Sequence, residues 1–200
     1  MAEIKLESTQ VVQYLKDRAD EDPRNRQKLL ALSRQIASLD DSQDKSWEGV
    51  VSWWKQIQED RGALATLRKC STPNEVRLKA PELWVSLLQR TKKRDASESV
   101  KQRVAILAVA LVLVPQNSNQ RLGLNFLGKN HKEPDLSPGR LQALLSIDSE
   151  HPQDLMRGIT RALKMVKSAN IPELTSLILF WSENQKMELA EEYFSNLKEN

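Results

Sequence analysis

An apolar run of eleven residues, Val104 to Val114, constrains the fold of this chain more than any other feature. A membrane-spanning helix needs about 20 apolar residues, and Pro115 ends the run well short of that length. The run therefore belongs in a protein core, and we expect no membrane partner. Its valines would suit a buried strand, but its length favours a helix. Asp95 with Glu98 three residues later, a spacing typical of a helix start, favours a helix too.

The rest of the chain also has the pattern of helices. Apolar residues recur at helical spacing, and no stretch alternates with period two for long enough to indicate a sheet. Beyond the apolar run, helices are expected at 4–19, 24–39, 121–128, 138–147, 152–169 and 184–197, with another opened by Pro172. The sequence thus predicts an all-α fold, a helical bundle of roughly eight to ten helices with an extra N-terminal helical pair.

The best linker is the polar stretch "DDSQDKS" at residues 40–46. It separates an N-terminal helical extension, residues 1–45, from a helical domain at 46–200, with lobes at about 46–118 and 119–200. In the extension, Leu29, Leu32, Ile36 and Leu39 form one apolar stripe, which must bury against the main core or against another protein.

The charges are segregated along the chain. The net charge is +3 overall, but it is −3 for residues 1–60, +10 for residues 61–172 and −4 for residues 173–200. Segregated positive charge is typical of a protein that binds a polyanion. The alternative is that two acidic ends fold back on a basic middle.

Nothing in the sequence predicts catalysis, a metal or a cofactor. The two histidines, His131 and His151, stand apart from any set of residues at metal-ligand spacing. The single cysteine, Cys70, reads as a core residue and suits a reducing compartment. With no signal peptide pattern at the N-terminus, we expect a cytoplasmic protein. "GLNFLGKN" (123–130) nearly fits a phosphate-binding loop, but Asn130 replaces the required hydroxyl residue.

Two stretches of the chain are rich in Arg and Lys at helical spacing. In the helix expected at 152–169, Arg157, Arg161 and Lys164 gather opposite an apolar face, and Lys167 follows with no acidic residue between Leu155 and Pro172. Like charges at helical spacing repel one another, so such a stripe indicates an anionic ligand, although a solvated face is the simpler alternative.

The second stretch is "RGALATLRKCSTPNEVR" (61–77), which contains Arg61, Arg68, Lys69 and Arg77. Arg61 and Arg68 are seven residues apart and share a helix face, while Leu64 and Leu67 point inward. Phosphate backbones are the usual ligands of such stripes. The five tryptophans lie among Leu and Val and read mainly as core residues.

Four blocks resemble, in order, the CasB family, the small subunit of the type I-E CRISPR surveillance complex called Cascade. They are "VSWWKQIQEDRGALATLRKCSTPNEVR", "LGLNFLG", "LSPGRLQALLSIDSEHPQDLMRGITRALKMVKSANIP" and "LILFWSENQKMELAEEYF". They cover about residues 46–196, whereas residues 1–45 resemble nothing in the family.

The resemblance implies an all-helical, non-catalytic subunit that contacts guide RNA and target DNA through basic faces and stabilises the R-loop. It implies two copies in the complex, beside the CasC backbone subunits. Leu124 and Gly139 stand where many members are polar or basic, so the resemblance implies either weaker binding here or a compensating role for Lys129 and Lys132. The predicted nucleic-acid-binding residues are Arg61, Arg68, Lys69, Arg77, Arg121, Lys129, Lys132, Arg140, Arg157, Arg161, Lys164 and Lys167. The rival prediction is a helical scaffold whose basic face docks an acidic protein.

Overall fold

The computed structural model describes residues 48–129 and 133–197. The chain divides into two compact units, Met1–Glu48 and Gly49–Asn200, of which the second is described below. The helices expected at 4–19 and 24–39 and the linker at 40–46 lie outside the described residues, so the N-terminal extension stays a prediction.

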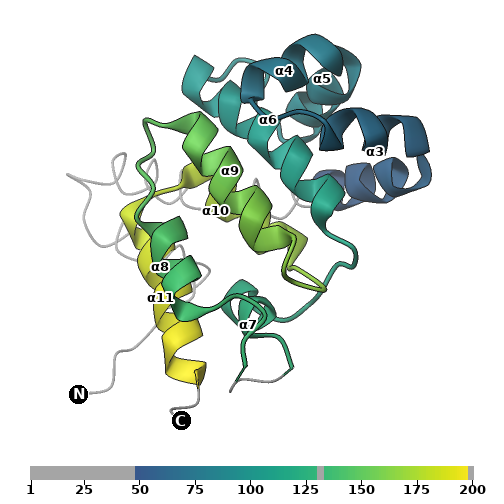
Figure 1. Cartoon of the computed structure of the whole chain (residues 1–200). Helices are drawn as coiled ribbons and strands as arrows, with labels where there is room; N and C mark the ends of the chain where they lie inside the picture. Colours follow the sequence, from purple (N-terminus) through teal and green to yellow (C-terminus); the bar gives the residue numbers. More distant parts are fainter. Residues whose placement is uncertain (1–47, 130–132, 198–200) are drawn as a thin grey trace, which may run out of the picture. The chain divides into compact units, whose positions relative to one another are not determined.

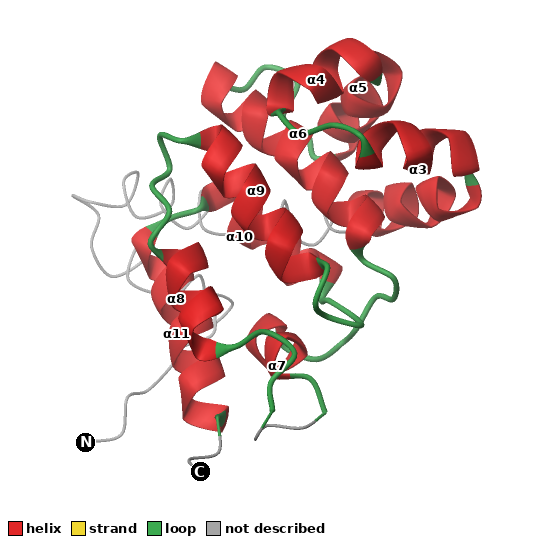
Figure 2. Cartoon of the chain, in the orientation of Figure 1, coloured by secondary structure: helices red, strands yellow, loops and turns green. Residues whose placement is uncertain are grey.

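The described part of the chain is built from helices and contains no strand, which confirms the predicted all-α fold (Figure 2). A first helix covers residues 48–59. The others, labelled in Figure 1, are α3 (Arg61–Arg68), α4 (Pro73–Lys79), α5 (Pro81–Arg90), α6 (Glu98–Leu113), α7 (Leu122–Leu127), α8 (Pro138–Leu145), α9 (Pro152–Leu163), α10 (Ile171–Phe180) and α11 (Glu183–Asn196).

Helix α6 lies at the centre of the domain, as its apolar run predicts. Every residue from Val104 to Val112 is buried, and α6 contacts α3, α4, α5, α9 and α10 (Figure 1). A helix that is apolar on all sides must be surrounded on all sides. The buried residues of both expected lobes belong to one cluster, and the division into lobes stays a prediction.

The helix start expected at Asp95 is wrong. Residues 93–96 form a turn, closed by the Ala96 N–H donating to the Lys93 carbonyl, and α6 begins only at Glu98 with Ser97 as its N-cap. The turn takes up the residues that a capping box would need, and no side chain caps the helix there.

The C-terminal end of α6 is bound by side chains from the preceding helices. Trp54 donates from Nε1 to the Val114 carbonyl at 3.1 Å, Gln58 donates to the same oxygen at 3.4 Å, and Arg68 donates to the Val112 carbonyl at 3.4 Å. The last carbonyls of a helix have no partner within it, so these three side chains satisfy groups that are otherwise orphaned.

The helix expected at 152–169 is shorter than predicted, because α9 ends at Leu163 with Lys164 as its C-cap. The following segment pairs with the loop after α6 instead. The Ala169 N–H donates to the Gln116 carbonyl, the Ser118 N–H donates to the Ala169 carbonyl, and Asn117 and Ala169 form an isolated parallel bridge. Asn170 then caps α10 by accepting from the Glu173 N–H.

Candidate nucleic-acid interface

A groove of about 610 Å³ lies between α8 and α9. Its floor is apolar and is formed by Leu136, Ala143, Leu144, Ile147, Gly158, Ala162 and Met165. Four of the predicted basic residues also line it: Arg140 on α8, Arg157 and Arg161 on α9, and Lys164 at the end of α9. The structure therefore brings one third of the predicted site residues to a single place, on two facing walls.

The amphipathic pattern of α9 positions the longer wall. Leu155, Met156, Ile159, Ala162 and Leu163 are buried, whereas Arg157, Arg161 and Lys164 are exposed, which confirms the predicted apolar face. Lys167 is also exposed, but it follows the helix end and does not line the groove.

Gly158 sets how closely the two walls approach. A β-carbon at this position would lie 2.4 Å from Ile147 Cδ1 and 3.0 Å from Leu144 Cδ1, closer than atoms can pack. Gly158 and Ala162 are four residues apart and so share a face of α9. This pair of small residues is the signal in the sequence that indicates the close approach of the two walls.

Ile147 follows α8 and forms part of the groove floor. Its carbonyl oxygen accepts two hydrogen bonds, which hold it in place. Trp181 Nε1 and Lys186 Nζ both donate to this oxygen at 3.0 Å. The Lys186 side chain is nearly buried, and it also pairs with Glu183 at 2.9 Å. A buried ammonium group needs such partners, so α11 fixes the groove floor through a contact that the sequence did not predict.

The charges at the rim are held loosely. Arg140 donates from Nη1 to the Met165 sulfur at 3.1 Å, and a thioether is a weak acceptor. Arg157 pairs with Asp154, the acidic member of the described lining residues. The Arg157–Asp154 ion pair is exposed, and exposed ion pairs contribute little to stability. A phosphate oxygen would be a stronger partner than this thioether for the Arg140 guanidinium.

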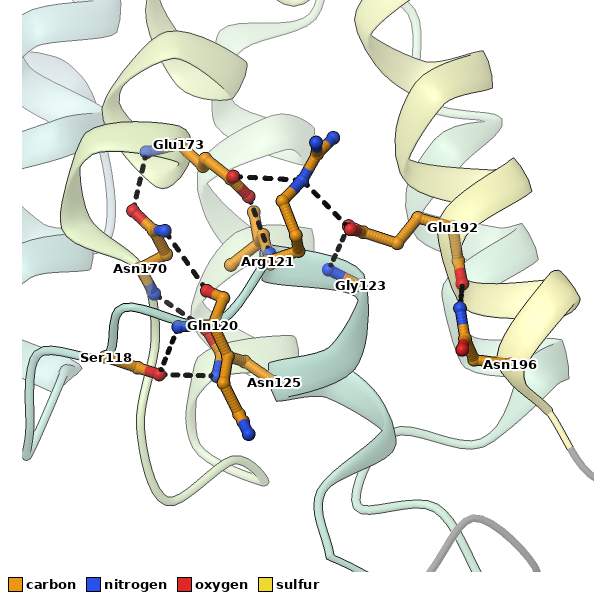
Figure 3. A network of polar contacts seen from close by, with 10 residues as sticks. Ser118, Gln120, Arg121, Gly123, Asn125, Asn170, Glu173, Glu192 and Asn196 are labelled. Carbon is orange, nitrogen blue, oxygen red and sulfur yellow. Dashed lines mark hydrogen bonds and ion pairs between the residues drawn. The ribbon is translucent and has the colours of Figure 1, made fainter.

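Arg121 does not belong to this groove. Figure 3 shows it between two carboxylates, with its Nε 3.1 Å from Glu173 and 2.9 Å from Glu192. The same carboxylates accept from the first N–H groups of α7, since Glu173 binds the Leu122 N–H at 2.6 Å and Glu192 binds the Gly123 N–H at 2.9 Å. Carboxylates stabilise a helix N-terminus, so Arg121 contributes to joining α7, α10 and α11.

The predicted basic residues of α3 and α4 lie on other surfaces. Arg61 and Lys69 are exposed at the two ends of α3, and Leu64 and Leu67 point inward as predicted. Arg68 is exposed but bonded to the end of α6. Arg77 pairs with Glu98 and lies over the Trp84 ring at 4.8 Å. Lys129 is exposed, and Lys132 lies outside the described residues.

The structure gives no reactive or ligand-binding setting to the cysteine, to the near-match to a phosphate-binding loop or to the described tryptophans. Cys70 is buried, and burial raises the pKa of its thiol, which keeps it protonated. The near-match to a phosphate-binding loop forms helix α7 through Leu127. Trp53 and Trp181 are buried, and Trp54 and Trp84 pack against the core. Among the described residues, no group of three or more His, Cys, Asp or Glu could hold a metal ion.

None of the helices in residues 48–129 and 133–197 combines the length and the apolar character that crossing a membrane requires.

Fold and groove together define an all-helical protein with a basic-walled surface groove. The chain belongs to the CRISPR-associated protein Cse2 family, whose model matches residues 63–194. This confirms the membership in CasB, the type I-E small-subunit family, that the sequence resemblance predicted. A search of the curated proteins finds no match.

A solved structure has the same fold. It is a chain in the crystal structure of Escherichia coli Cascade bound to a PAM-containing double-stranded DNA target, with a TM-score of 0.53 and 18% sequence identity. The match covers 74% of the present chain and 97% of that chain. At this identity the likeness concerns the fold.

Proposed function

We propose that this protein is a non-catalytic subunit of a type I-E Cascade complex, and that the groove between α8 and α9 binds the sugar-phosphate backbone of guide RNA or target DNA. Membership in the Cse2 family and the shared fold with a chain of E. coli Cascade support the placement in such a complex. Its neighbours there would include the CasC backbone and a second copy of this chain.

The observation that carries the proposal is the convergence of Arg140, Arg157, Arg161 and Lys164 on one groove. Several positive groups along one groove suit a chain of phosphates. Each phosphate contact releases condensed counterions, which favours binding. Such contacts are independent of sequence. In RNA-guided recognition, base pairing selects the target, and protein contacts to the backbones favour one side of a nearly balanced strand exchange.

The first prediction tests this groove with neutral substitutions on both walls. Arg140→Gln combined with Arg161→Gln should weaken the binding of the full-length protein to single-stranded DNA. Each lost phosphate contact should reduce the slope of log affinity against log salt by about 0.7. The measurement is a binding titration across a salt series, followed by target-DNA affinity of the reconstituted complex.

The matched control is Lys55→Gln combined with Arg94→Gln, which removes two exposed charges that do not line the groove. This variant should keep the wild-type salt slope. If the two double variants behave alike, the groove is not the binding site. If the groove variant folds, binds DNA normally on its own and yet fails to enter the complex, the rival prediction of a protein-docking face is correct.

A further inference from the structure

The floor of the groove is accessible as well as apolar. Ala143 is exposed, and Ile147 and Met165 are half-buried, so apolar surface is open to water between the basic walls. Phosphate contacts alone would need only the rim. Keeping apolar surface accessible has a free-energy cost that grows with its area, which indicates a ligand with an apolar part as well as negative charges.

The volume narrows the class of ligand. At about 610 Å³ the groove lies within the range of about 300–1,000 Å³ that is typical of small-molecule sites. A nucleobase has flat faces that can pack on apolar surface, and it is joined to its phosphate through the sugar. The positions of Arg140 on one wall and of Arg161 and Lys164 on the other allow phosphates to bind at the rim while a base enters between them.

Only a single strand can make this contact. In a duplex the bases are stacked and paired, so their faces are hidden, whereas an unpaired base offers its face to a protein surface whatever its identity. Arg157 is paired with Asp154 at the end of the groove near the start of α9. This pair lowers the net positive charge there and leaves the rest of the rim as the stronger phosphate site.

We propose that the accessible part of the floor, formed by Ala143, Ile147 and Met165, binds an unstacked nucleobase of a single strand whose phosphates contact Arg140, Arg161 and Lys164. This inference rests on the proposed function, because it uses the same groove. It adds that the groove selects single strands over duplexes and that base faces contribute to affinity.

The second prediction compares two probes that have the same phosphates. One is an oligothymidine, and the other is an oligonucleotide of equal length made of abasic residues. The full-length protein should bind the abasic strand about tenfold more weakly, because that strand lacks the base faces that would cover the apolar floor. The salt slopes of the two probes should be equal, because the number of phosphate contacts is the same.

Two variants of equal size locate the base contact. Because Ala143 is exposed, Ala143→Gln and Ala143→Met both leave the core intact. Ala143→Gln makes the floor polar and should remove most of the preference for the oligothymidine, whereas Ala143→Met should keep it. The Arg140→Gln, Arg161→Gln variant should instead weaken the binding of both probes.

The outcomes separate this inference from the proposed function. Equal affinity for both probes with a steep salt slope that the arginine variant reduces would leave the proposed function standing and overturn the base contact. An unchanged preference in Ala143→Gln would also overturn it, because the base would then bind elsewhere. A salt slope that the arginine variant does not change would overturn both.

Discussion

Arginines of equal charge have different roles in this protein, and their contacts decide which. Arg161 lies at the rim of a groove, Arg121 joins two carboxylates at the start of α7, and Arg68 donates to a carbonyl at the end of α6. A stretch of basic residues in the sequence does not distinguish these cases. The same substitution should therefore affect binding at one position and folding at another.

The third prediction concerns the two ends of α3. Arg68→Glu should lower the free energy of unfolding by about 1 kcal/mol, because it removes the bond to the Val112 carbonyl and places negative charge beside the C-terminal ends of α3 and α6. Arg61→Glu makes the same change in charge at the first residue of α3, where a carboxylate is favourable. It should leave stability unchanged or raise it by up to about 1 kcal/mol.

The measurement is chemical denaturation of both variants at low ionic strength and again at high salt, where the difference between them should shrink. Equal stability of the two variants would mean that the Arg68 contact to α6 has no energetic role.

At the residue scale, the sequence predicted which basic side chains of α9 are exposed, but it did not predict the groups that Arg121 contacts. Arg157, Arg161 and Lys164 are exposed as the helical period of α9 predicts. The carboxylates of Glu173 and Glu192 stand about 50 and 70 residues after Arg121, and only the folded chain brings them together. For these residues the alternative reading of the charge pattern, an acidic end folding back on the basic middle, is correct.

At the scale of elements, the two walls of the groove approach each other closely at a glycine. α8 packs on α9 through Ile147 and Leu144, which lie where a side chain at Gly158 would stand. The sequence predicted both helices, but it overestimated α9 by six residues. The reason is the pairing of Ala169 with Gln116 and Ser118, a contact between segments about 50 residues apart that no local pattern reveals.

The fourth prediction tests the close approach of Gly158 and Ile147 with a double-mutant cycle. Gly158→Ala gains up to about 1 kcal/mol of helix propensity, but its β-carbon would overlap the Ile147 side chain. Overpacking typically costs about 1–3 kcal/mol, so the single variant should be less stable than the wild type by about 1 kcal/mol.

Ile147→Val removes the Cδ1 atom that would be overlapped. In that background Gly158→Ala should be neutral or stabilising, which gives a coupling energy of about 1–2 kcal/mol in thermal or chemical denaturation. Additive effects of the two substitutions would show that Ile147 does not limit the approach of α9.

At the scale of the whole molecule, the last helix closes the domain through a buried hydroxyl group. Tyr193 on α11 is fully buried, and its hydroxyl donates to the Leu136 carbonyl at 2.5 Å, just before α8. Burial raises the pKa of Tyr193 to about 12 from its ordinary value of 10.0. The folded state therefore keeps the proton at a pH where the unfolded chain loses it.

The fifth prediction follows from this difference in pKa. Below pH 10 the hydroxyl is protonated in both states, and its contribution to stability is fully present. Between about pH 10 and 12 only the unfolded chain ionises, so the wild type should lose about 3 kcal/mol of stability from this group.

Tyr193→Phe should be less stable than the wild type near pH 8, by about 1 kcal/mol for the lost hydrogen bond. It should lack the alkaline loss due to this group, so the two stability curves should converge above pH 10 and cross before pH 12. Parallel curves from pH 8 to 12 would contradict the assigned pKa.

The two walls of the groove are supported by different parts of the domain. α9 packs on the central helix α6, so moving it would disturb the main core, whereas α8 contacts α9 and α11. The two ends of α8 are tied to the C-terminal part of the chain, through the Ile147 carbonyl, which accepts from Trp181 and Lys186, and through the Leu136 carbonyl, which accepts from Tyr193. If the proposed function holds, phosphates and base faces on these two walls would hold a strand without reading its sequence, because every base has such a face.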